Sequence, residues 1–374
     1  MRIRTFIWIL LGAAMLTSCM DDDAWYGIND LDGFKDTPAN GSGGQTGLFV
    51  VNEGNFMYDN ASLSYYSAGS MKVENEVFFR TNRIPLGDVA QSMFIRDSLG
   101  YIIINNSSKI YVINIHTFAY EGKITGLVSP RYLHFISDRK AYVSDLYAKA
   151  ITIIDPVTLE ITGHIDTDNH ETEFYQHPTG QMVRYEDLVF TNCWSYDNMI
   201  LVIDTETDQV IDSIEVLKQP NSLVIDRYGK LWTVTDGGME GSPFGYEAPG
   251  LMRIDAESRT VEWICMFEPG ERPSELTING TGDTLYFING DIYRHPVLSE
   301  EEPELFLPGP ASHSHPGRYF GLGVDPVTSE VYIADAVDHV QRGMVYRSRS
   351  DGMPLDTFRV GINPGAFCFV PADR

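Results

Sequence analysis

The feature that most restricts how this chain can fold is an apolar strand that recurs along most of its length. Seven copies begin at Ala90, Pro130, Pro178, Pro220, Pro273, Pro316 and Pro364. The intervals between them are 40, 48, 42, 53, 43 and 48 residues. A repeat of this length cannot bury a hydrophobic face alone, so its copies are expected to stack on one another.

The clearest copy, residues 130–165, shows what one repeat contains. Its apolar segments LHFI, AYVSD, ITIID and EITGHI are rich in aliphatic and aromatic residues, and the turns between them carry Asp, Pro, Ser and Gly. This pattern is typical of four short strands in a meander. Seven such copies predict an all-β fold, a seven-bladed β-propeller with four antiparallel strands per blade.

The two ends of the repeat region complement each other. Residues 47–80 contain three strand segments, GLFVVNE, ASLSYYS and NEVFFR, without the leading strand of the other copies. Pro364–Val370 is such a leading strand with no repeat after it. We therefore expect a propeller over residues 47–374 in which the C-terminal strand completes the N-terminal blade, closes the ring and covers an open sheet edge.

The sequence of the N-terminus indicates a targeting segment. Arg2 and Arg4 precede the apolar run Phe6–Leu16, which predicts a signal peptide over residues 1–18. The following Cys19 ends a Leu-Thr-Ser-Cys sequence that resembles the lipobox of bacterial lipoproteins and implies lipidation of this cysteine. The acidic run 20–23 resembles the surface-export signal of Bacteroidetes lipoproteins, and the glycine-rich end of residues 19–46 favours a flexible tether. Simple cleavage and a solvated acidic tail are the alternatives.

The charge of the chain excludes one class of partner. Its formal net charge is −25, and without residues 1–18 it has 25 basic and 52 acidic residues, or −27. Binding to nucleic acid requires a basic surface, so no nucleic-acid partner is expected. Electrostatic docking on anionic lipid is disfavoured for the same reason, which leaves the lipid anchor as the predicted membrane contact.

The long loops of the repeats are expected to lie on one face of the ring. In a propeller blade, the loop before the first strand and the loop between the second and third strands share a face, and binding residues are commonly placed on such loops. Aromatic residues provide large, rigid contact areas there, although they can equally pack the loops onto the blades. The aromatic ligand-binding candidates are Phe56, Tyr58, Tyr147, Trp194, Tyr196, Phe244 and Tyr246.

A second set of candidates should surround the mouth of the central channel. The residues after each leading Pro or Ala are Gln91, Arg131, Thr179, Asn221, Ser274, Gly317 and Gly365. Of these, Gln91, Arg131 and Asn221, together with Tyr132, complete the predicted ligand-binding set. The alternative is that this polar ring only holds water.

Catalytic and metal motifs are weak. No Walker loop, GxSxG elbow, HExxH sequence or zinc cysteine pair occurs. The pair His313 and His315 is too small for a metal site, and the calcium-like start at Asp166 fails where His170 and Glu171 stand. We expect no enzyme, name no catalytic or metal residue, and leave a lactonase-like calcium set of Glu53, Asn55 and Asp145 open. Cys193, Cys265 and Cys368 have no CxxC spacing and are more typical of buried free thiols, with one disulfide left open.

The amino-acid sequences of the repeats resemble those of a known family. Segments such as KIYVINIHTFAYEGKI and DNMILVIDTETDQVIDSI resemble YVTN-type propellers. The chain resembles the BtuG-type surface lipoproteins of the YVTN/YncE-like propellers. The resemblance rests on NEGN at Asn52–Asn55, NASLSYY at Asn60–Tyr66 and the predicted signals for lipidation and surface export.

This resemblance implies a function and a location. It implies capture of vitamin B12 (cobalamin) and related corrinoids on one propeller face without a required cofactor. It also implies handover to a BtuB-like TonB-dependent outer-membrane transporter, by a protein lipid-anchored to the outer membrane at the cell surface. A surface adhesin for protein or glycan and a calcium-dependent lactonase-like hydrolase remain the alternatives.

Overall fold

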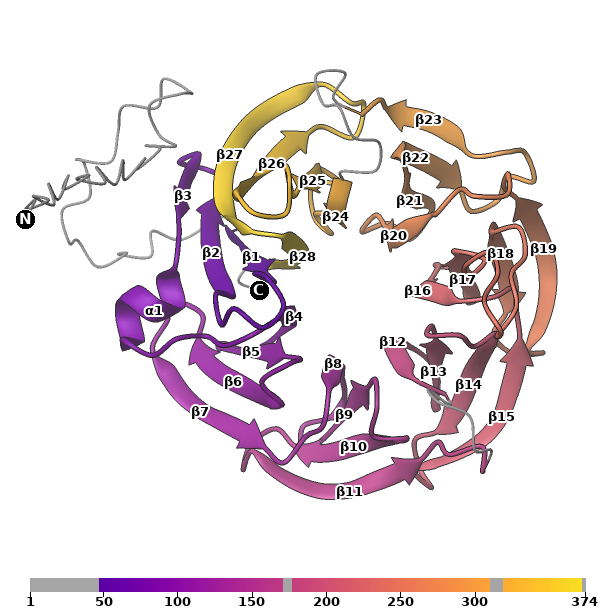
Figure 1. Ribbon diagram of the computed structural model, residues 1–374, viewed down its shortest axis with the longest axis horizontal. Helices are drawn as coiled ribbons and strands as arrows, with labels where there is room; N and C mark the ends of the chain where they lie inside the picture. The colour runs from indigo at the N-terminus through magenta and orange to yellow at the C-terminus, as the bar shows by residue number, and fades with distance from the viewer. Residues whose placement is uncertain (1–46, 171–176, 310–318, 372–374) are drawn as a thin grey trace, which may run out of the picture. The chain divides into compact units, whose positions relative to one another are not determined.

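The computed structural model describes residues 47–170, 177–309 and 319–371. They form seven sheets of four antiparallel strands, arranged in a ring around a central channel (Figure 1). The prediction of an all-β, seven-bladed propeller is confirmed. The signal peptide, Cys19 and the tether lie outside the described residues, as do Gly317, His313 and His315.

The blades follow one another along the chain, each running from the channel outward. The N-terminal blade contains β1 (Gly47–Asn52), β2 (Ser62–Ser67) and β3 (Lys72–Glu74), with β28 (Pro364–Phe369) as its innermost strand. The next three blades are β4 (Ala90–Arg96), β5 (Leu99–Ile104), β6 (Lys109–Asn114), β7 (Tyr120–Thr125); β8 (Pro130–Ser137), β9 (Lys140–Asp145), β10 (Ala150–Asp155), β11 (Glu160–Asp166); and β12 (Thr179–Tyr185), β13 (Leu188–Cys193), β14 (Met199–Asp204), β15 (Gln209–Glu215). The last three are β16 (Pro220–Ile225), β17 (Lys230–Thr235), β18 (Gly250–Asp255), β19 (Thr260–Met266); β20 (Ser274–Ile278), β21 (Thr284–Asn289), β22 (Asp291–Pro296), β23 (Glu304–Leu307); and β24 (Tyr319–Val324), β25 (Val331–Asp335), β26 (Arg342–Ser348), β27 (Pro354–Ile362).

The ring is closed by the pairing of β28 with β1, as the sequence predicts. The two strands are antiparallel, with Leu48 opposite Phe369 and Asn52 opposite Pro364. Every residue of β1 is buried. The first and last parts of the chain therefore form one sheet, and β1 is not left as an edge strand.

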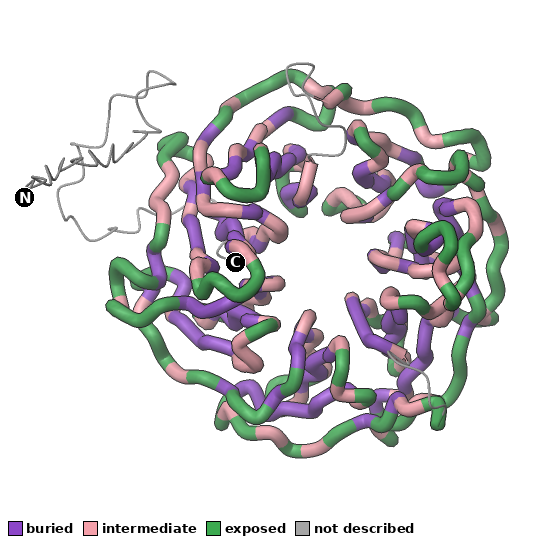
Figure 2. Tube along the Cα trace, in the orientation of Figure 1, coloured by how far each residue is buried: buried purple, intermediate pink, exposed green. Residues whose placement is uncertain are grey.

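The hydrophobic core lies between neighbouring blades rather than at the centre of the ring. In β9 and β10 all residues but the first are buried, because each sheet is covered on both faces by the next blade. Trp232 is the largest fully buried side chain. Figure 2 shows this burial close to the channel and exposed positions along the outer rim.

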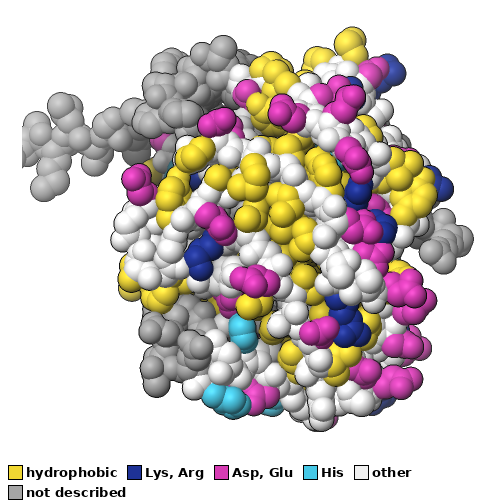
Figure 3. Space-filling model, turned by 90° about the vertical axis from the view of Figure 1, so that its right-hand side faces the viewer, with side chains coloured by type: hydrophobic (Ala, Val, Ile, Leu, Met, Phe, Trp, Pro, Cys, Tyr) yellow, Lys and Arg dark blue, Asp and Glu magenta, His cyan; other side chains and the backbone are white. Residues whose placement is uncertain are grey.

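The outermost strands face solvent and carry mixed side chains. Met266 in β19 and Leu305 in β23 are each about half exposed. On the side of the ring that these strands occupy, hydrophobic and acidic side chains are interleaved, and the acidic ones are not gathered in one patch (Figure 3). On this side of the ring, acidic side chains are therefore spread among hydrophobic ones.

One predicted strand is wrong. The NEVFFR segment forms a short helix, α1 (Val77–Asn82), while β3 ends earlier at Glu74. Glu76 has a left-handed conformation, with φ of 56°, which breaks the strand. A strand would place Val77 and Phe78 on opposite faces, whereas a helical turn allows both to be buried. No helix among the described residues is long and apolar enough to cross a membrane.

Candidate functional site

The innermost strand of each blade begins with a β-bulge. In β4, Ala90 pairs with Ile104 and Ser92 pairs with Ile103, so that Gln91 is an extra residue. The corresponding extra positions are Arg131–Tyr132 in β8, Gly180–Gln181 in β12, Asn221 in β16, Glu275–Leu276 in β20, Phe320 in β24 and Gly365 in β28. A bulge leaves a residue unpaired and redirects its side chain. The fold therefore brings one irregular position per blade to the channel.

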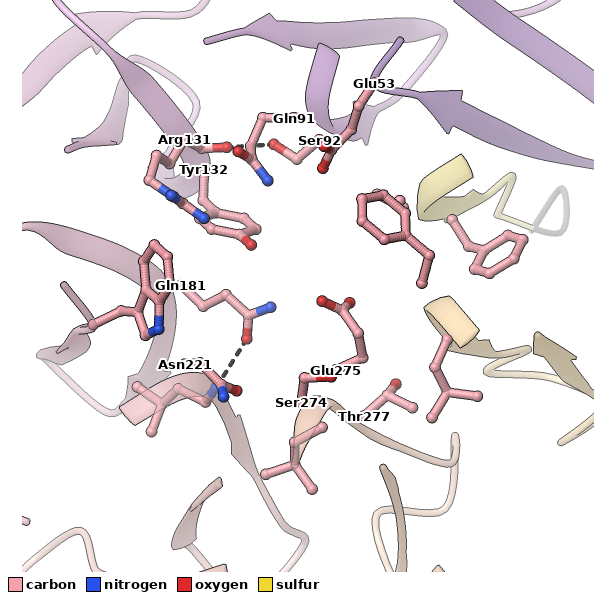
Figure 4. A pocket seen from close by; sticks show the side chains of 18 of the residues that line it. Glu53, Gln91, Ser92, Arg131, Tyr132, Gln181, Asn221, Ser274, Glu275 and Thr277 are labelled. Carbon is pink, nitrogen blue, oxygen red and sulfur yellow. Dashed lines mark hydrogen bonds between the residues drawn. The ribbon is translucent and has the colours of Figure 1, made fainter. Parts of the chain in front are cut away.

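These bulges line a single cavity of about 670 Å³ (Figure 4). Its lining draws on all seven blades: Glu53, Gln91–Phe94, Arg131–Leu133, Gln181, Met182, Trp194, Asn221, Leu223, Asp236, Ser274–Thr277, Tyr319, Phe320, Leu322 and Gly365–Phe367. Small-molecule sites typically have volumes of about 300–1,000 Å³. The size and the mixture of aromatic and polar walls are those of a ligand pocket.

The structure separates the predicted ligand-binding residues into two groups. Gln91, Arg131, Tyr132, Trp194 and Asn221 line the cavity. The other candidates, Phe56, Tyr58, Tyr147, Tyr196, Phe244 and Tyr246, lie on loops and are not part of its lining.

The loop aromatics themselves are of two kinds. Phe56 and Tyr58 are 64% and 75% exposed. Tyr196 and Phe244 instead pack against each other with their ring centroids 4.6 Å apart. The first pair is mostly exposed to solvent, whereas the packing of the second pair holds two loops together.

Trp194 is held in a fixed orientation at the wall of the cavity. Its indole Nε1 donates a hydrogen bond to Oδ2 of Asp236 over 3.0 Å, and the amide of Gln219 donates to Oδ1 of the same carboxylate over 2.7 Å. The guanidinium carbon of Arg131 lies 5.4 Å from the centroid of the Trp194 ring, a cation–π contact. A ligand that contacts this side chain does not have to order it first.

Amide side chains form a second part of the wall. Oε1 of Gln181 accepts a hydrogen bond of 2.8 Å from the backbone N–H of Leu223. The amide of Asn221 donates to the carbonyl of Pro273 over 2.7 Å. Gln91 points toward the cavity and makes no hydrogen bond with another described residue (Figure 4). The wall thus presents positioned amides of the kind that pair with amides of a ligand.

Three carboxyl groups, those of Glu53, Asp236 and Glu275, line the cavity together with the guanidinium of Arg131. Burial raises the pKa of Glu53 to about 7, against the opposing effect of Arg131. Burial, together with repulsion from Glu53, raises the pKa of Glu275 to about 8. The side chains of Glu53 and Glu275 have no hydrogen-bond or ion-pair partner among the described residues, whereas Asp236 accepts hydrogen bonds from Trp194 and Gln219. Because the pKa of Glu275 lies above neutral pH, Glu53 and Glu275 together hold at least one proton there, and this proton can be donated in a hydrogen bond to a neutral ligand.

The sequence did not identify Gln181, Glu275 and Phe320, because the predicted channel positions in these three blades lie one to three residues too early in the chain. Thr179 was expected at the channel but is buried, and its hydroxyl accepts a 3.0 Å hydrogen bond from the backbone N–H of Asp145. Ser274 does line the cavity, but the extra residue of that strand is its neighbour Glu275.

The spacing between the bulged residue and the first apolar residue of the inner strand differs between blades. The missed residues Gln181 and Glu275 stand directly before Met182 and Leu276. Two positions before Met93, Leu133 and Leu223 stand the bulged residues Gln91, Arg131 and Asn221. Glu53 has no such spacing, because it follows β1 and reaches the cavity from a loop.

The lactonase-like calcium set does not assemble. Oδ2 of Asp145 accepts the backbone N–H of Ser129, and Oδ1 accepts those of Tyr147 and Ala148. The amide of Asn55 donates to the carbonyl of His339. Both side chains are committed to holding loops, and of the three residues only Glu53 lines the cavity.

A family model described as a domain of unknown function, DUF5074, matches residues 46–347. The chain belongs to the DUF5074 family. The match ends inside β26, before the last two strands, although the DUF5074 chain needs β28 to close its ring. None of the curated proteins matches the sequence.

Several solved structures are similar to this DUF5074 chain at low sequence identity. A periplasmic gluconolactonase of Pseudomonas aeruginosa has a TM-score of 0.65 and 10% identity, with 88% of this chain and 100% of that chain covered. A quinonprotein alcohol dehydrogenase-like protein of Bacteroides thetaiotaomicron has a TM-score of 0.63 and 14% identity, with 86% of this chain and 77% of that chain covered. Hydrazine synthase of Kuenenia stuttgartiensis has a TM-score of 0.61 and 14% identity, with 75% of this chain and 89% of that chain covered. Identities this low show the fold alone.

Proposed function

We propose that this protein is a surface lipoprotein that captures vitamin B12 or a related corrinoid at the mouth of the central cavity and passes it to a TonB-dependent outer-membrane transporter. The observation that carries the proposal is the cavity, which combines fixed amides, aromatic rings and a pair of carboxyl groups that holds at least one proton near neutral pH. The reaction is binding and release, without chemical change.

The chemistry of the cavity suits a corrinoid. This ligand is a broad, flat macrocycle rimmed with neutral amides. The cavity of about 670 Å³ accepts only part of such a ligand, so the macrocycle would lie across the mouth with amide groups reaching inward. Gln91 and Gln181 can pair with those amides, and Trp194 offers a rigid apolar contact. Side chains that are fixed in advance lose little entropy on binding, which favours high affinity.

Calorimetry with cyanocobalamin on the full-length protein in detergent tests this proposal. We expect one ligand per chain, and a coloured protein peak on gel filtration. The absence of both heat and retained colour would contradict corrinoid capture.

One observation favours a second function, a metal-dependent hydrolase. Glu53 and Glu275 both face the cavity, and paired carboxylates are common ligands of calcium. Metal analysis of the purified protein, followed by assays with lactones, separates the two functions. Stoichiometric calcium together with chelator-sensitive turnover would favour the hydrolase, whereas corrinoid binding that is insensitive to chelator favours capture.

The lipid anchor and the surface location belong to the same proposal. They rest on the signal-like segment and the lipobox-like sequence that ends at Cys19. In cells fed with an alkyne fatty acid, we expect the wild-type protein to be labelled and accessible to external protease. The variant Cys19→Ala should be unlabelled and released from the membrane fraction; labelling of this variant would refute the assignment.

A further inference from the structure

Three potential metal ligands meet beside the cavity, on the loops of the fourth blade. His177 precedes β12, Cys193 ends β13, and Asp197 lies in the loop between β13 and β14. One ligand atom from each residue lies within 4.8 Å of those of the other two. Among the described residues, this is the only such group of three.

The structure holds each of these ligands in place. The backbone of Cys193 pairs with both Thr179 and Met199, which fixes the thiol at the end of a central strand. Oδ1 of Asp197 accepts the N–H of Asn198 over 2.7 Å, which leaves Oδ2 for another partner. That Oδ2 lies 2.8 Å from Nδ1 of His177. A thiol, an imidazole nitrogen and one carboxylate oxygen therefore converge.

We propose that His177, Cys193 and Asp197 form a zinc-binding site with a fourth position open to water. Thiolate, imidazole and carboxylate together are a typical ligand set for Zn²⁺, and three protein ligands with one open position is a known arrangement. Bond lengths of about 2.0–2.3 Å place zinc ligands about 3.5 Å apart, so the longest separations, up to 4.8 Å, have to shorten by up to about 1.3 Å. Nδ1 of His177 and Oδ2 of Asp197, which are 2.8 Å apart, have to separate by about 0.7 Å to admit the ion between them.

Proton balance on binding is simple. Burial and the nearby charge of Asp197 raise the pKa of the Cys193 thiol well above its ordinary value, so the metal-free thiol carries its proton. Zinc displaces that proton to solvent and forms the metal–sulfur bond. Nδ1 of His177 has to carry no proton when it binds the metal.

A route from solvent to the site exists. His177 and Asp197 have side chains that are 19% and 13% exposed. His177 also lines a cavity of about 280 Å³ together with Asp166, Asp168 and Asp212. Asp168 is paired with Lys149 and Asp212 with Arg259, which leaves Asp166 as the carboxylate on the approach without an ion pair among the described residues. A carboxylate there attracts a divalent cation before it reaches the thiol.

The consequence of metal binding concerns the central cavity. Trp194 stands between Cys193 and Asp197 and lines that cavity. A metal ion held by residues on both sides of Trp194 would clamp the short loop that carries it. The site is thus a positioning device for a ligand-contacting loop, and its existence does not depend on which ligand the cavity takes.

A cobalt titration tests the site. The full-length protein is stripped with a chelator and titrated with Co²⁺, with Zn²⁺ as the competitor. We expect one Co²⁺ per chain, a near-ultraviolet thiolate-to-cobalt charge-transfer band that Zn²⁺ abolishes, and slower hydrogen exchange in residues 194–198. The absence of the band in the wild-type protein would overturn the proposal.

Matched variants keep the test specific. Cys193→Ser should lose the band, whereas Cys265→Ser, which changes another free cysteine, should keep it. His177→Gln and Asp197→Asn should each weaken Co²⁺ binding by at least about tenfold. These two variants decide the matter if Cys193→Ser does not fold, as judged by circular dichroism. A band that survives in Cys193→Ser, or unchanged affinity in both other variants, refutes the site.

Discussion

Trp194 illustrates how a single residue is prepared for binding. The hydrogen bond to Asp236 fixes its edge, and Arg131 lies over its ring. An aromatic side chain held in this way, at the wall of a pocket, has the properties of a binding hot spot.

We therefore expect Trp194→Ala to weaken corrinoid binding by about 1–3 kcal/mol, because an anchored aromatic contact is lost. Calorimetry with cyanocobalamin measures the change. Tyr58→Ala is the matched control, since this tyrosine is 75% exposed and lies outside the cavity lining. An equal loss in both variants would mean that the loops, rather than the cavity, supply the binding energy.

Glu275 gives a prediction about pH and stability. Its pKa is about 8 in the folded protein, above the ordinary value of 4.5, so the folded state binds more protons between these values. The free energy of unfolding must then fall as pH rises through this window. Glu275→Gln cannot ionise, so we expect it to be more stable than the wild-type protein at pH 9 by about 1–3 kcal/mol, with little difference near pH 4.

Chemical denaturation of Glu275→Gln and wild-type protein across this pH range measures that difference. The exposed Glu301→Gln is the control and should follow the wild-type curve. A constant offset between wild-type and Glu275→Gln at all pH values would show that packing, not ionisation, causes the effect.

At the same scale, the sequence predicts only part of the cavity. Arg131 and Asn221 could be placed because each directly follows a proline that opens an inner strand. Glu275 could not, because Pro273 stands one residue before its strand. A register error of one residue is invisible to composition, yet it changes which side chain occupies the bulge.

At the scale of elements, close backbone contact between β24 and β28 explains a glycine. A Cβ atom on Gly321 would lie 2.8 Å from the carbonyl oxygen of Pro364 and 2.9 Å from that of Gly365. Backbone atoms cannot move aside as side chains can, so this position between the last two inner strands requires the absence of a side chain.

We expect Gly321→Ala to destabilise the protein by about 1–3 kcal/mol, because the strands must separate to relieve the overlap. Gly163→Ala is the control, since its Cβ would be in ordinary contact at 3.4 Å from Ile153. Denaturant midpoints of both variants measure the effect. A neutral Gly321→Ala would show that the two inner strands can part without cost.

Strands were easier to predict than the one helix in the N-terminal blade. Each repeat carries turn residues that punctuate its apolar segments, so the strands could be counted. Val77 and Phe78 are two apolar residues in a row, and such a pair fits a buried strand or a helical turn equally well. Packing against the neighbouring blade, where the Phe78 ring lies 5.0 Å from that of Tyr111, decides in favour of the helix.

At the scale of the whole molecule, the ring depends on β28. Ending the chain at Asn363 removes this strand and exposes the buried β1 to solvent. We expect the shortened protein to lose its cooperative thermal transition and to aggregate, because a long unpaired strand edge is left in the channel. Circular dichroism melting and gel filtration measure this.

A chain ending at Pro371, which keeps all of β28, is the control for that truncation. It should melt like the full chain. A cooperative transition in the Asn363 truncation would show that six blades and an open sheet are sufficient.

The architecture of the whole molecule was the part most accessible from sequence. The number of leading strands gave the number of blades, and the unmatched segments at the two ends gave the closure. The meeting of His177, Cys193 and Asp197 was not accessible, because Cys193 ends a strand of the fourth blade while the other two residues lie on separate loops. Only the pairing of strands brings such residues together.

The pairing of β1 with β28 also determines when the ring can close during synthesis of the chain. A ribosome makes the chain from its N-terminus, so the strand that must sit beside β1 is among the last to appear. Middle blades can acquire structure as they emerge, but the first blade has to wait with one inner partner missing. The ring therefore cannot close until β28 has been made, and β1 stays without its inner neighbour while the other blades are synthesised.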